Sequence, residues 1–157
     1  MKAVFLSFAL FVFVLSLYGK SKQDNDELYR PQSHFSPAVN WMGNPSGLIY
    51  QNGEYHLFYQ LNPYQNQSGQ FNLGHAVSTN LVTWTNLPVA IKAEALDTSD
   101  VRIGSAWSGS VIVDENNLLK KQTSSSKTWV MFYSVFKKGI KIAYSTDNGK
   151  SWNNSEN

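Results

Sequence analysis

The side chains that could carry out catalysis are few and scattered along this 157-residue chain. There is no cysteine, which excludes both a disulfide framework and a thiolate metal site. The three histidines, His34, His56 and His75, are too far apart for a local metal motif, so we expect them to pack in the core or in turns. Most of the eleven acidic residues fall in predicted loops or turns, and we expect the adjacent pair Asp114 and Glu115 to be solvated. The sequence therefore predicts neither a metal site nor a cofactor, and it presents no pair of catalytic carboxylates.

Two side chains near predicted strand ends could bind a ligand instead. Gln60 ends an apolar strand, where a polar side chain needs a partner, and that partner could be a substrate or the backbone. Trp107 immediately precedes a predicted strand, as Asn44 does earlier in the chain. An aromatic ring at that place could contact a sugar or pack in the core. The other strand tryptophans are expected to serve packing: Trp84, Trp129 and Trp152.

Short strands between turn signals must position these residues. Asn52-Gly53 is a hairpin signal between an apolar run and an alternating, aromatic-rich run. The predicted strands of a first unit are residues 47–51, 54–60, 72–78 and 83–87. Those of a second unit are residues 111–114, 128–135 and 140–145, with a last strand at Trp152. Because Ala-x-Ser at residues 76–78 returns at residues 143–145, the pattern predicts an all-β chain of repeated four-stranded units, as in propeller blades.

Residues 145–152 read Ser-Thr-Asp-Asn-Gly-Lys-Ser-Trp. This segment resembles the S-x-D-x-G-x-S/T-W Asp-box of sialidases and other propellers. In that interpretation Asp147 hydrogen bonds within its own turn, Gly149 adopts a positive φ, and Trp152 packs beneath the turn. The role predicted for Asp147 is therefore structural, not catalytic.

Five motifs spread over residues 29–152 match one known family as a set. They are R-P-Q-x-H-F-x-P at residues 30–37, W-M-x-N-P-x-G at 41–47, G-x-Y-H-L-F-Y-Q-x-N-P at 53–63, G-H-A-x-S-x-x-L-x-x-W at 74–84 and W-S-G-S at 107–110. Together they resemble glycoside hydrolase family 32, the invertases, exo-inulinases and levanases. The resemblance implies a five-bladed β-propeller, of which this chain would hold about the first two blades.

The resemblance also implies a chemistry, which is the retaining hydrolysis of terminal β-fructofuranosides such as sucrose, inulin or levan, without a cofactor. That reaction needs two carboxyl groups about 5–5.5 Å apart. The Asp that serves the family as nucleophile is replaced by Asn44, and an amide is a poor nucleophile. Pro45 has no backbone N–H, so deamidation is not expected to restore the acid. The family's R-D-P and E-C motifs, which carry the stabilising Asp and the acid/base Glu, have no counterpart here. We therefore expect no hydrolysis from this chain.

Part of the family's sugar site remains. The residues at substrate-binding positions of the family are Asn44, Gln60, Trp107 and Ser108. Two tryptophans that shape the family's fructose pocket are replaced by Ser68 and Leu73, and the second Asn of the signature motif is Ser46. Binding of fructose-containing sugars is therefore expected to be weak or lost.

The N-terminal residues indicate secretion. Lys2 is followed by fifteen residues without a charge, which is too short for a membrane span of about 20 residues and fits a signal peptide at residues 1–19. An uncleaved N-terminal anchor is the alternative. A polar leader is expected at residues 20–28, followed by a partial propeller domain at 29–157. Asn66 and Asn153 begin possible glycosylation sequons. The net charge of +2 comes from scattered lysines, which argues against nucleic acid as a partner, and no stable membrane partner is expected.

Three functions remain open at this stage. The first is a β-fructofuranosidase by descent, whose active form would need a longer chain and an Asp at position 44. The second is a non-catalytic protein that keeps a face for fructan or sucrose. The third is a degenerate truncated product that does not fold alone, because two blades cannot close a ring and would leave sheet edges open.

Overall fold

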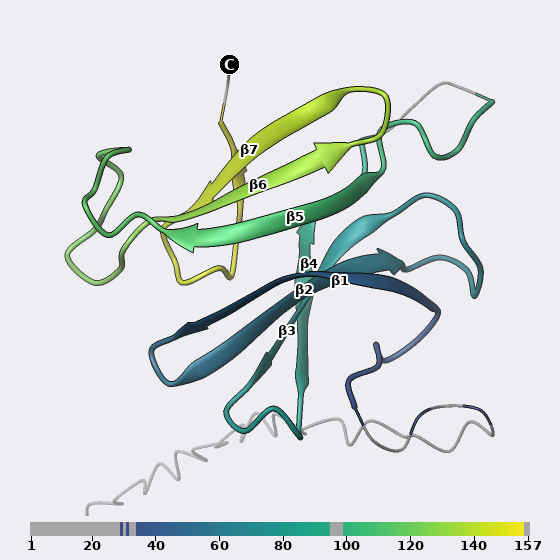
Figure 1. Ribbon diagram of the computed structural model, residues 1–157, viewed down its shortest axis with the longest axis horizontal. Helices are drawn as coiled ribbons and strands as arrows, with labels where there is room; N and C mark the ends of the chain where they lie inside the picture. Colours follow the sequence, from purple (N-terminus) through teal and green to yellow (C-terminus); the bar gives the residue numbers. More distant parts are fainter. Residues whose placement is uncertain (1–28, 30, 32–33, 95–98, 156–157) are drawn as a thin grey trace, which may run out of the picture.

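The computed structural model describes residues 29, 31, 34–94 and 99–155. The predicted signal peptide and polar leader lie outside these residues. The chain forms two four-stranded sheets, each a simple antiparallel meander (Figure 1). The described residues contain no helix, and therefore none that could cross a membrane. The all-β fold with four strands in each unit is as the sequence predicts.

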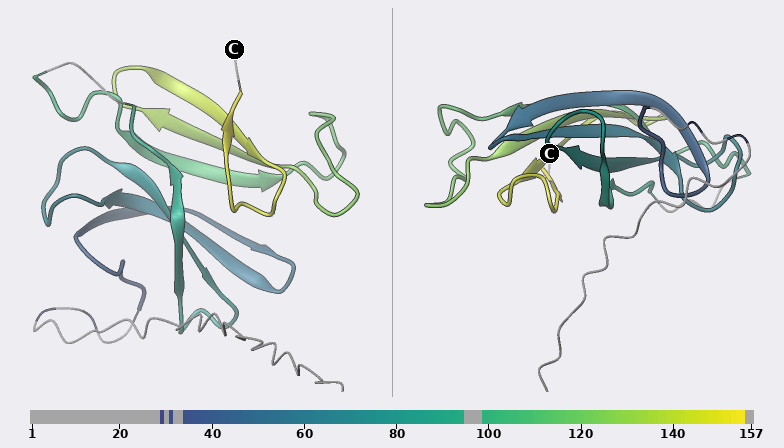
Figure 2. Two further views of the ribbon diagram at one scale, coloured as in Figure 1. Left: turned by 180° about the vertical axis from the view of Figure 1, so that it is seen from behind. Right: turned by 90° about the horizontal axis from the view of Figure 1, so that it is seen from below.

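The first sheet contains β1 (Trp41–Gln51), β2 (Glu54–Asn62), β3 (Asn72–Ser78) and β4 (Thr85–Ile91). The second sheet contains β5 (Ala106–Val113), β6 (Trp129–Val135), β7 (Gly139–Ser145) and β8 (Asn153–Asn154). Figures 1 and 2 show the two sheets lying side by side, and β1 and β5 make the closest approach between them. The beginnings of these two strands therefore share one end of the molecule, which we call the site end.

Several predicted strand limits are wrong. β1 begins at Trp41 instead of residue 47, because its first half is a bulged strand with register shifts on both sides of Pro45. Proline has no N–H for the ladder and is tolerated at such bulges, so a Gly-, Pro- and Ser-containing stretch pairs without looking like a strand. For the same reason the Ser-Gly-Ser start of β5 lies inside a strand that begins at Ala106. β4 lies two to four residues later than predicted, and the last strand is Asn153–Asn154 instead of Trp152.

The hairpin turns have the geometry that their sequences predict. Asn52 and Gly53 have φ values of 54° and 85°, and Asn148 and Gly149 have values of 59° and 79°. Positive φ at both central residues is typical of type I′ turns, which match the right-handed twist of the flanking strands. These turns set the register of β1 on β2 and help to place the end of β7.

The core lies between the two sheets. Phe58, Leu73 and Ile91 of the first sheet meet a larger set from the second: Ala106, Met131, Tyr133, Val135 and Ala143. Burying a side chain the size of Phe, Leu or Met contributes about 1.5–3 kcal/mol, so this interface is the main source of stability. Trp129 is fully buried and Trp152 packs edge-on against Phe58 with ring centroids 5.6 Å apart, as expected for packing residues. Trp84 is half-buried beside Phe35.

Candidate functional site

Three of the four predicted site residues are linked by hydrogen bonds at the site end. Asn44 lies in the bulged part of β1, Gln60 near the end of β2, and Trp107 near the start of β5. The Asn44 backbone N–H donates to Gln60 Oε1 over 3.3 Å, and Gln60 Nε2 donates to the Trp107 carbonyl over 2.6 Å. The Gln60 amide therefore joins the first sheet to the second.

The side chain of Gln60 is buried, with 6% of its surface exposed. Gly43 makes this position possible, because a Cβ there would lie 2.5 Å from Trp41 Cη2 and closer still to Gln60 Oε1. Of the two partners that the sequence left open for Gln60, the structure shows the backbone.

Asn44 itself presents its side chain to solvent. Its amide group makes no hydrogen bond with any described residue, while its backbone N–H is held by Gln60. An exposed, neutral amide at this place could donate and accept hydrogen bonds with a ligand but supplies no negative charge.

An aromatic row crosses the site end from one sheet to the other. Trp41 stacks on Phe71 with centroids 4.9 Å apart, and Phe71 lies 6.0 Å from Trp107. Trp107 then stacks on Phe136 at 4.8 Å with only 14° between the ring planes. Among these four residues the sequence singled out Trp107 alone as a candidate site residue, because the row joins four separate chain segments.

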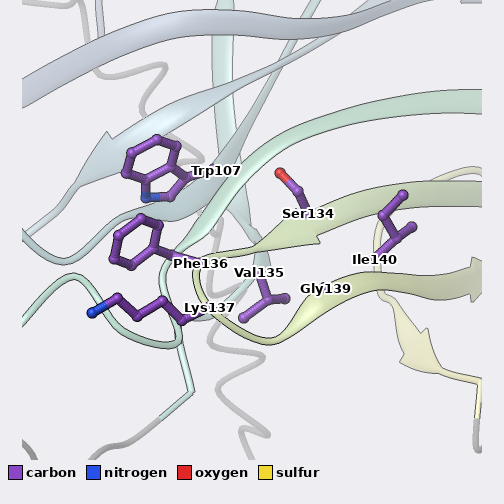
Figure 3. Close-up of a pocket in the computed structure, with 7 residues that line it drawn as sticks. All are labelled: Trp107, Ser134, Val135, Phe136, Lys137, Gly139 and Ile140. Atoms are coloured by element: carbon purple, nitrogen blue, oxygen red, sulfur yellow. The ribbon is translucent and has the colours of Figure 1, made fainter.

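A cavity of about 330 Å³ opens beside the Trp107–Phe136 stack (Figure 3). It is lined by Trp107, Ser134, Val135, Phe136, Lys137, Gly139 and Ile140. The Trp107 indole N–H is buried and makes no hydrogen bond with the described residues. A buried donor without a partner costs free energy, so it favours a ligand or water with an acceptor oxygen.

Ser108 lies next to this stack and is exposed. Its backbone exchanges hydrogen bonds with Ser134 Oγ, which accepts from the Ser108 N–H over 3.3 Å and donates to the Ser108 carbonyl over 3.4 Å. This pairing bridges the bulge of β5 and leaves the Ser108 hydroxyl facing outward.

Each of the six described carboxylates has a structural partner away from this end-to-end row. Asp114 accepts from the backbone N–H groups of Leu118 and Leu119 at 2.8 Å, and it is 7% exposed, so the prediction of a solvated pair is wrong for Asp114. A loop that folds back onto the end of β5 buries this carboxylate. The other five pair as follows: Glu54 with His56, Glu94 with Lys138 and Lys141, Asp100 with Arg102, Glu115 with Lys127, and Asp147 with Ser145 and Ser151.

Two histidines form a buried pair between the sheets. His56 Nδ1 and His75 Nε2 are 3.0 Å apart, and the His75 ring stacks on Phe58. Burial lowers the pKa of His75 to about 3, and the neighbouring His56 lowers it further. Packing in the core is therefore confirmed for these two, whereas His34 is exposed. No group of three His, Asp or Glu side chains that could hold a metal ion occurs within the described ranges.

Both glycosylation candidates are exposed. Asn66 lies in the loop between β2 and β3, and Asn153 lies in the edge strand β8, opposite Tyr144. Either side chain is accessible to a modifying enzyme at its position.

Two antiparallel four-stranded blades joined at a bulged first strand define the start of a β-propeller. The chain belongs to glycoside hydrolase family 32, because the model of the glycosyl hydrolases family 32 N-terminal domain matches residues 34–157. Its two sheets are about the first two blades of that family's five-bladed propeller.

Characterised relatives agree with this assignment. The chain is 47% identical over 130 residues to the levanase of Bacillus subtilis, an alignment that covers 81% of this chain and 18% of the levanase. Its structure is similar to that of the exo-inulinase of Aspergillus awamori, with a TM-score of 0.71 and 35% identity over 83% of this chain and 28% of that enzyme. The β-fructofuranosidase of Schwanniomyces occidentalis complexed with fructosyl-erythritol has a TM-score of 0.69 and 32% identity, over 82% of this chain and 26% of that one. The chain therefore spans less than a third of each of these relatives.

Proposed function

We propose that this chain is the N-terminal part of a β-fructofuranosidase-type hydrolase that has lost the hydrolytic step. The observation that supports the proposal is the identity and setting of Asn44. Its position in β1 is held by the Gln60 amide, so the scaffold of the site is retained while the reactive carboxylate is replaced by an amide.

The absence of hydrolysis follows from the chemistry of the side chains. An amide cannot form the glycosyl ester that a carboxylate nucleophile forms, and loss of a catalytic nucleophile lowers kcat by about 10⁴ or more. The six described carboxylates are held by lysines, an arginine, a histidine, hydroxyls or backbone N–H groups, so none is free to replace it.

The ligands that we propose are fructose-containing sugars such as sucrose and fructans, bound weakly. A related yeast enzyme has been solved with fructosyl-erythritol bound. In this chain both ends of the Gln60 amide are engaged with the protein, which leaves Asn44, Ser108 and the indole N–H of Trp107 to meet a sugar. Fewer polar partners mean lower affinity.

We further propose that the mature protein is extracellular, with a signal peptide at residues 1–19, a leader at 20–28 and the propeller domain from residue 29. The exo-inulinase relative from Aspergillus awamori is described as extracellular. Exposure of Asn66 and Asn153 is compatible with glycosylation at either site.

A chimera tests the loss of hydrolysis. Residues 34–157 replace the matching segment of the Bacillus subtilis levanase, with and without Asn44→Asp. We expect levan hydrolysis only with Asn44→Asp, at a rate about 10⁴ times that of the unchanged chimera. Asn66→Asp, which adds the same charge in an exposed loop, should restore nothing. Comparable turnover by the chimera that keeps Asn44 would contradict the proposal, and inactivity of both would show that this segment no longer serves a hydrolase.

A second candidate function is non-catalytic sugar binding. It is favoured by the unpaired indole N–H of Trp107 beside the 330 Å³ cavity. Near-UV circular dichroism of the chain, titrated with sucrose and inulin, should show a saturable change that is absent in Trp107→Leu but kept in Trp84→Leu. A featureless spectrum or aggregation without sugar would instead favour a degenerate product.

A further inference from the structure

The second sheet has an apolar outer face that nothing in the described chain covers. Its members are Ile112, Phe132, Ile140 and Ile142, which are 50%, 42%, 77% and 37% exposed. They lie on one face because Phe132 is paired with Ile142 and each of the others is two residues along its strand, or directly across, from that row. We call these four residues the outer face.

The repeat shows what such a face is for. In the first sheet Phe58 pairs with Gly47 and His75, as Phe132 pairs with Ser110 and Ile142 in the second. Counting from those rows, the positions that correspond to the outer face are Ile49, Phe58, Leu73 and His75. Phe58, Leu73 and His75 are no more than 1% exposed, because the second sheet packs on them. The outer face therefore has the register of a docking face for one more sheet.

The surface that docks on the first sheet has its own counterpart. Val111, Met131 and Ala143 form one row of the second sheet and pack into the core. The same row in the first sheet is Leu48, Leu57 and Ala76. Leu48 is 59% exposed and the next residue on that face of β1, Tyr50, is 58% exposed. We call Leu48 and Tyr50 the inner patch.

We propose that a second copy of this 157-residue chain docks its inner patch on the outer face, repeating between chains the contact that joins the two sheets within one chain. The occupant follows from continuity with that contact, since the first sheet of a second copy offers apolar residues in the matching register. Such a head-to-tail contact leaves one free face at each end, so association continues until a ring closes or a chain forms. Exposed apolar patches of this kind are typical of protein interfaces.

The first test is the mass of the purified 157-residue chain, measured by sedimentation over a series of concentrations. We expect mass to rise with concentration. Ile140→Glu on the outer face and Leu48→Glu on the inner patch should each weaken association at least about tenfold, because a buried charge would face apolar side chains. Leu118→Glu, at a 79% exposed position in the loop between β5 and β6, is the matched control and should change nothing.

Mixing the two variants makes the test specific. The Ile140→Glu chain keeps its inner patch and the Leu48→Glu chain keeps its outer face, so an equimolar mixture should form a one-to-one dimer that grows no further. Near-UV circular dichroism checks that both variants fold, and Ile140→Ser with Leu48→Ser provides a milder pair. A wild-type chain that stays monomeric overturns the proposal and assigns the face to another segment or protein. Leu48→Glu that self-associates like the wild type also overturns it, because the outer face would then pack against itself.

Discussion

The side-chain amide of Gln60 shows how one residue type can serve either recognition or architecture. Its oxygen accepts from Asn44 in β1 and its nitrogen donates to Trp107 in β5, so a single side chain joins strands from both sheets. An amide fits this position because it offers a donor and an acceptor without a charge that burial would penalise. The close approach depends on Gly43, which leaves room for the amide oxygen.

At this residue scale, Gly43→Ala should destabilise the chain by about 1–3 kcal/mol, because a Cβ would overlap Trp41 and Gln60. Gly47→Ala in the same strand is the control, since its Cβ would make ordinary contacts at 3.6 Å or more. Urea unfolding of both variants measures the difference. Equal losses would mean that the packing around Gln60 adapts freely and that this amide does not fix the site.

The Asp147 carboxylate is the centre of the turn between β7 and β8. It accepts from Ser145 Oγ at 2.7 Å, from the Ser151 N–H at 2.9 Å and from Ser151 Oγ at 2.6 Å, while Trp152 Nε1 donates to the Gly149 carbonyl at 3.0 Å. Burial raises the pKa of Asp147, but hydrogen bonds from Ser151 and Ser145 outweigh it and lower the pKa overall. These contacts give the carboxylate a structural role at the scale of the element, as the sequence motif predicts.

Asp147→Ala should therefore cost about 1–3 kcal/mol of unfolding free energy, because the donors from Ser145 and Ser151 lose their acceptor. Glu115→Ala, which removes an exposed carboxylate paired with Lys127, should cost much less. Thermal unfolding compares the two. If the Asp147→Ala chain melted with the wild type, the turn would be held by Gly149 and Trp152 alone.

A second element-scale prediction concerns the histidine pair between β2 and β3. Burial lowers the pKa of both rings, that of His75 to about 3, while Glu54 acts in the opposite direction on His56. The unfolded chain binds protons below about pH 6.5 that the folded chain refuses, so the free energy of unfolding should fall as the pH falls from about 6.5 towards 3. His75 alone should cost about 2 kcal/mol at pH 5 relative to pH 7.

The second sheet suggests the variant that removes this acid sensitivity. Val130 and Ile142 occupy the positions that His56 and His75 occupy in the first sheet, so His56→Val with His75→Ile tests the pair. Urea unfolding at pH 5 and pH 7 should show a smaller difference for this double variant than for the wild type. His34→Asn, at an exposed position, is the control. An unchanged pH dependence in the double variant would assign the acid sensitivity to other groups.

At the scale of the whole molecule, the sequence predicted what depends on local periodicity. Alternating strands such as β2 and β7 and the Asn-Gly turns were recognisable because strand and turn chemistry is local. The bulged start of β1, the burial of Asp114 and the partner of Gln60 were not, since each depends on a contact with a distant or irregular segment. The aromatic row was missed for the same reason, because Trp41 and Phe136 become neighbours of Phe71 and Trp107 only once the sheets dock.

The docking of the two sheets also has an electrostatic part. Glu94, which follows β4, forms ion pairs with Lys141 of β7 and with Lys138, whose Nζ is 2.5 Å from Glu94 Oε2. Hydrogen bonds from Lys138 and Lys141 lower the pKa of Glu94. Its stabilising effect is therefore present above about pH 4.5 and lost as the pH falls below that value.

Glu94→Gln should lower the free energy of unfolding by about 0.5–1 kcal/mol at low ionic strength, since partly exposed ion pairs contribute little each. In about 1 M NaCl, where charges are screened within about 3 Å, most of this difference should vanish. A double-mutant cycle of Glu94→Gln with Lys141→Met, followed by urea unfolding, isolates the coupling between the sheets. Arg102→Gln is the matched control, because its partner Asp100 lies in the same loop and the pair joins no two sheets. A coupling energy near zero at low salt would mean that apolar packing alone holds the blades together, and that the outer face and inner patch could dock between copies without any help from charge.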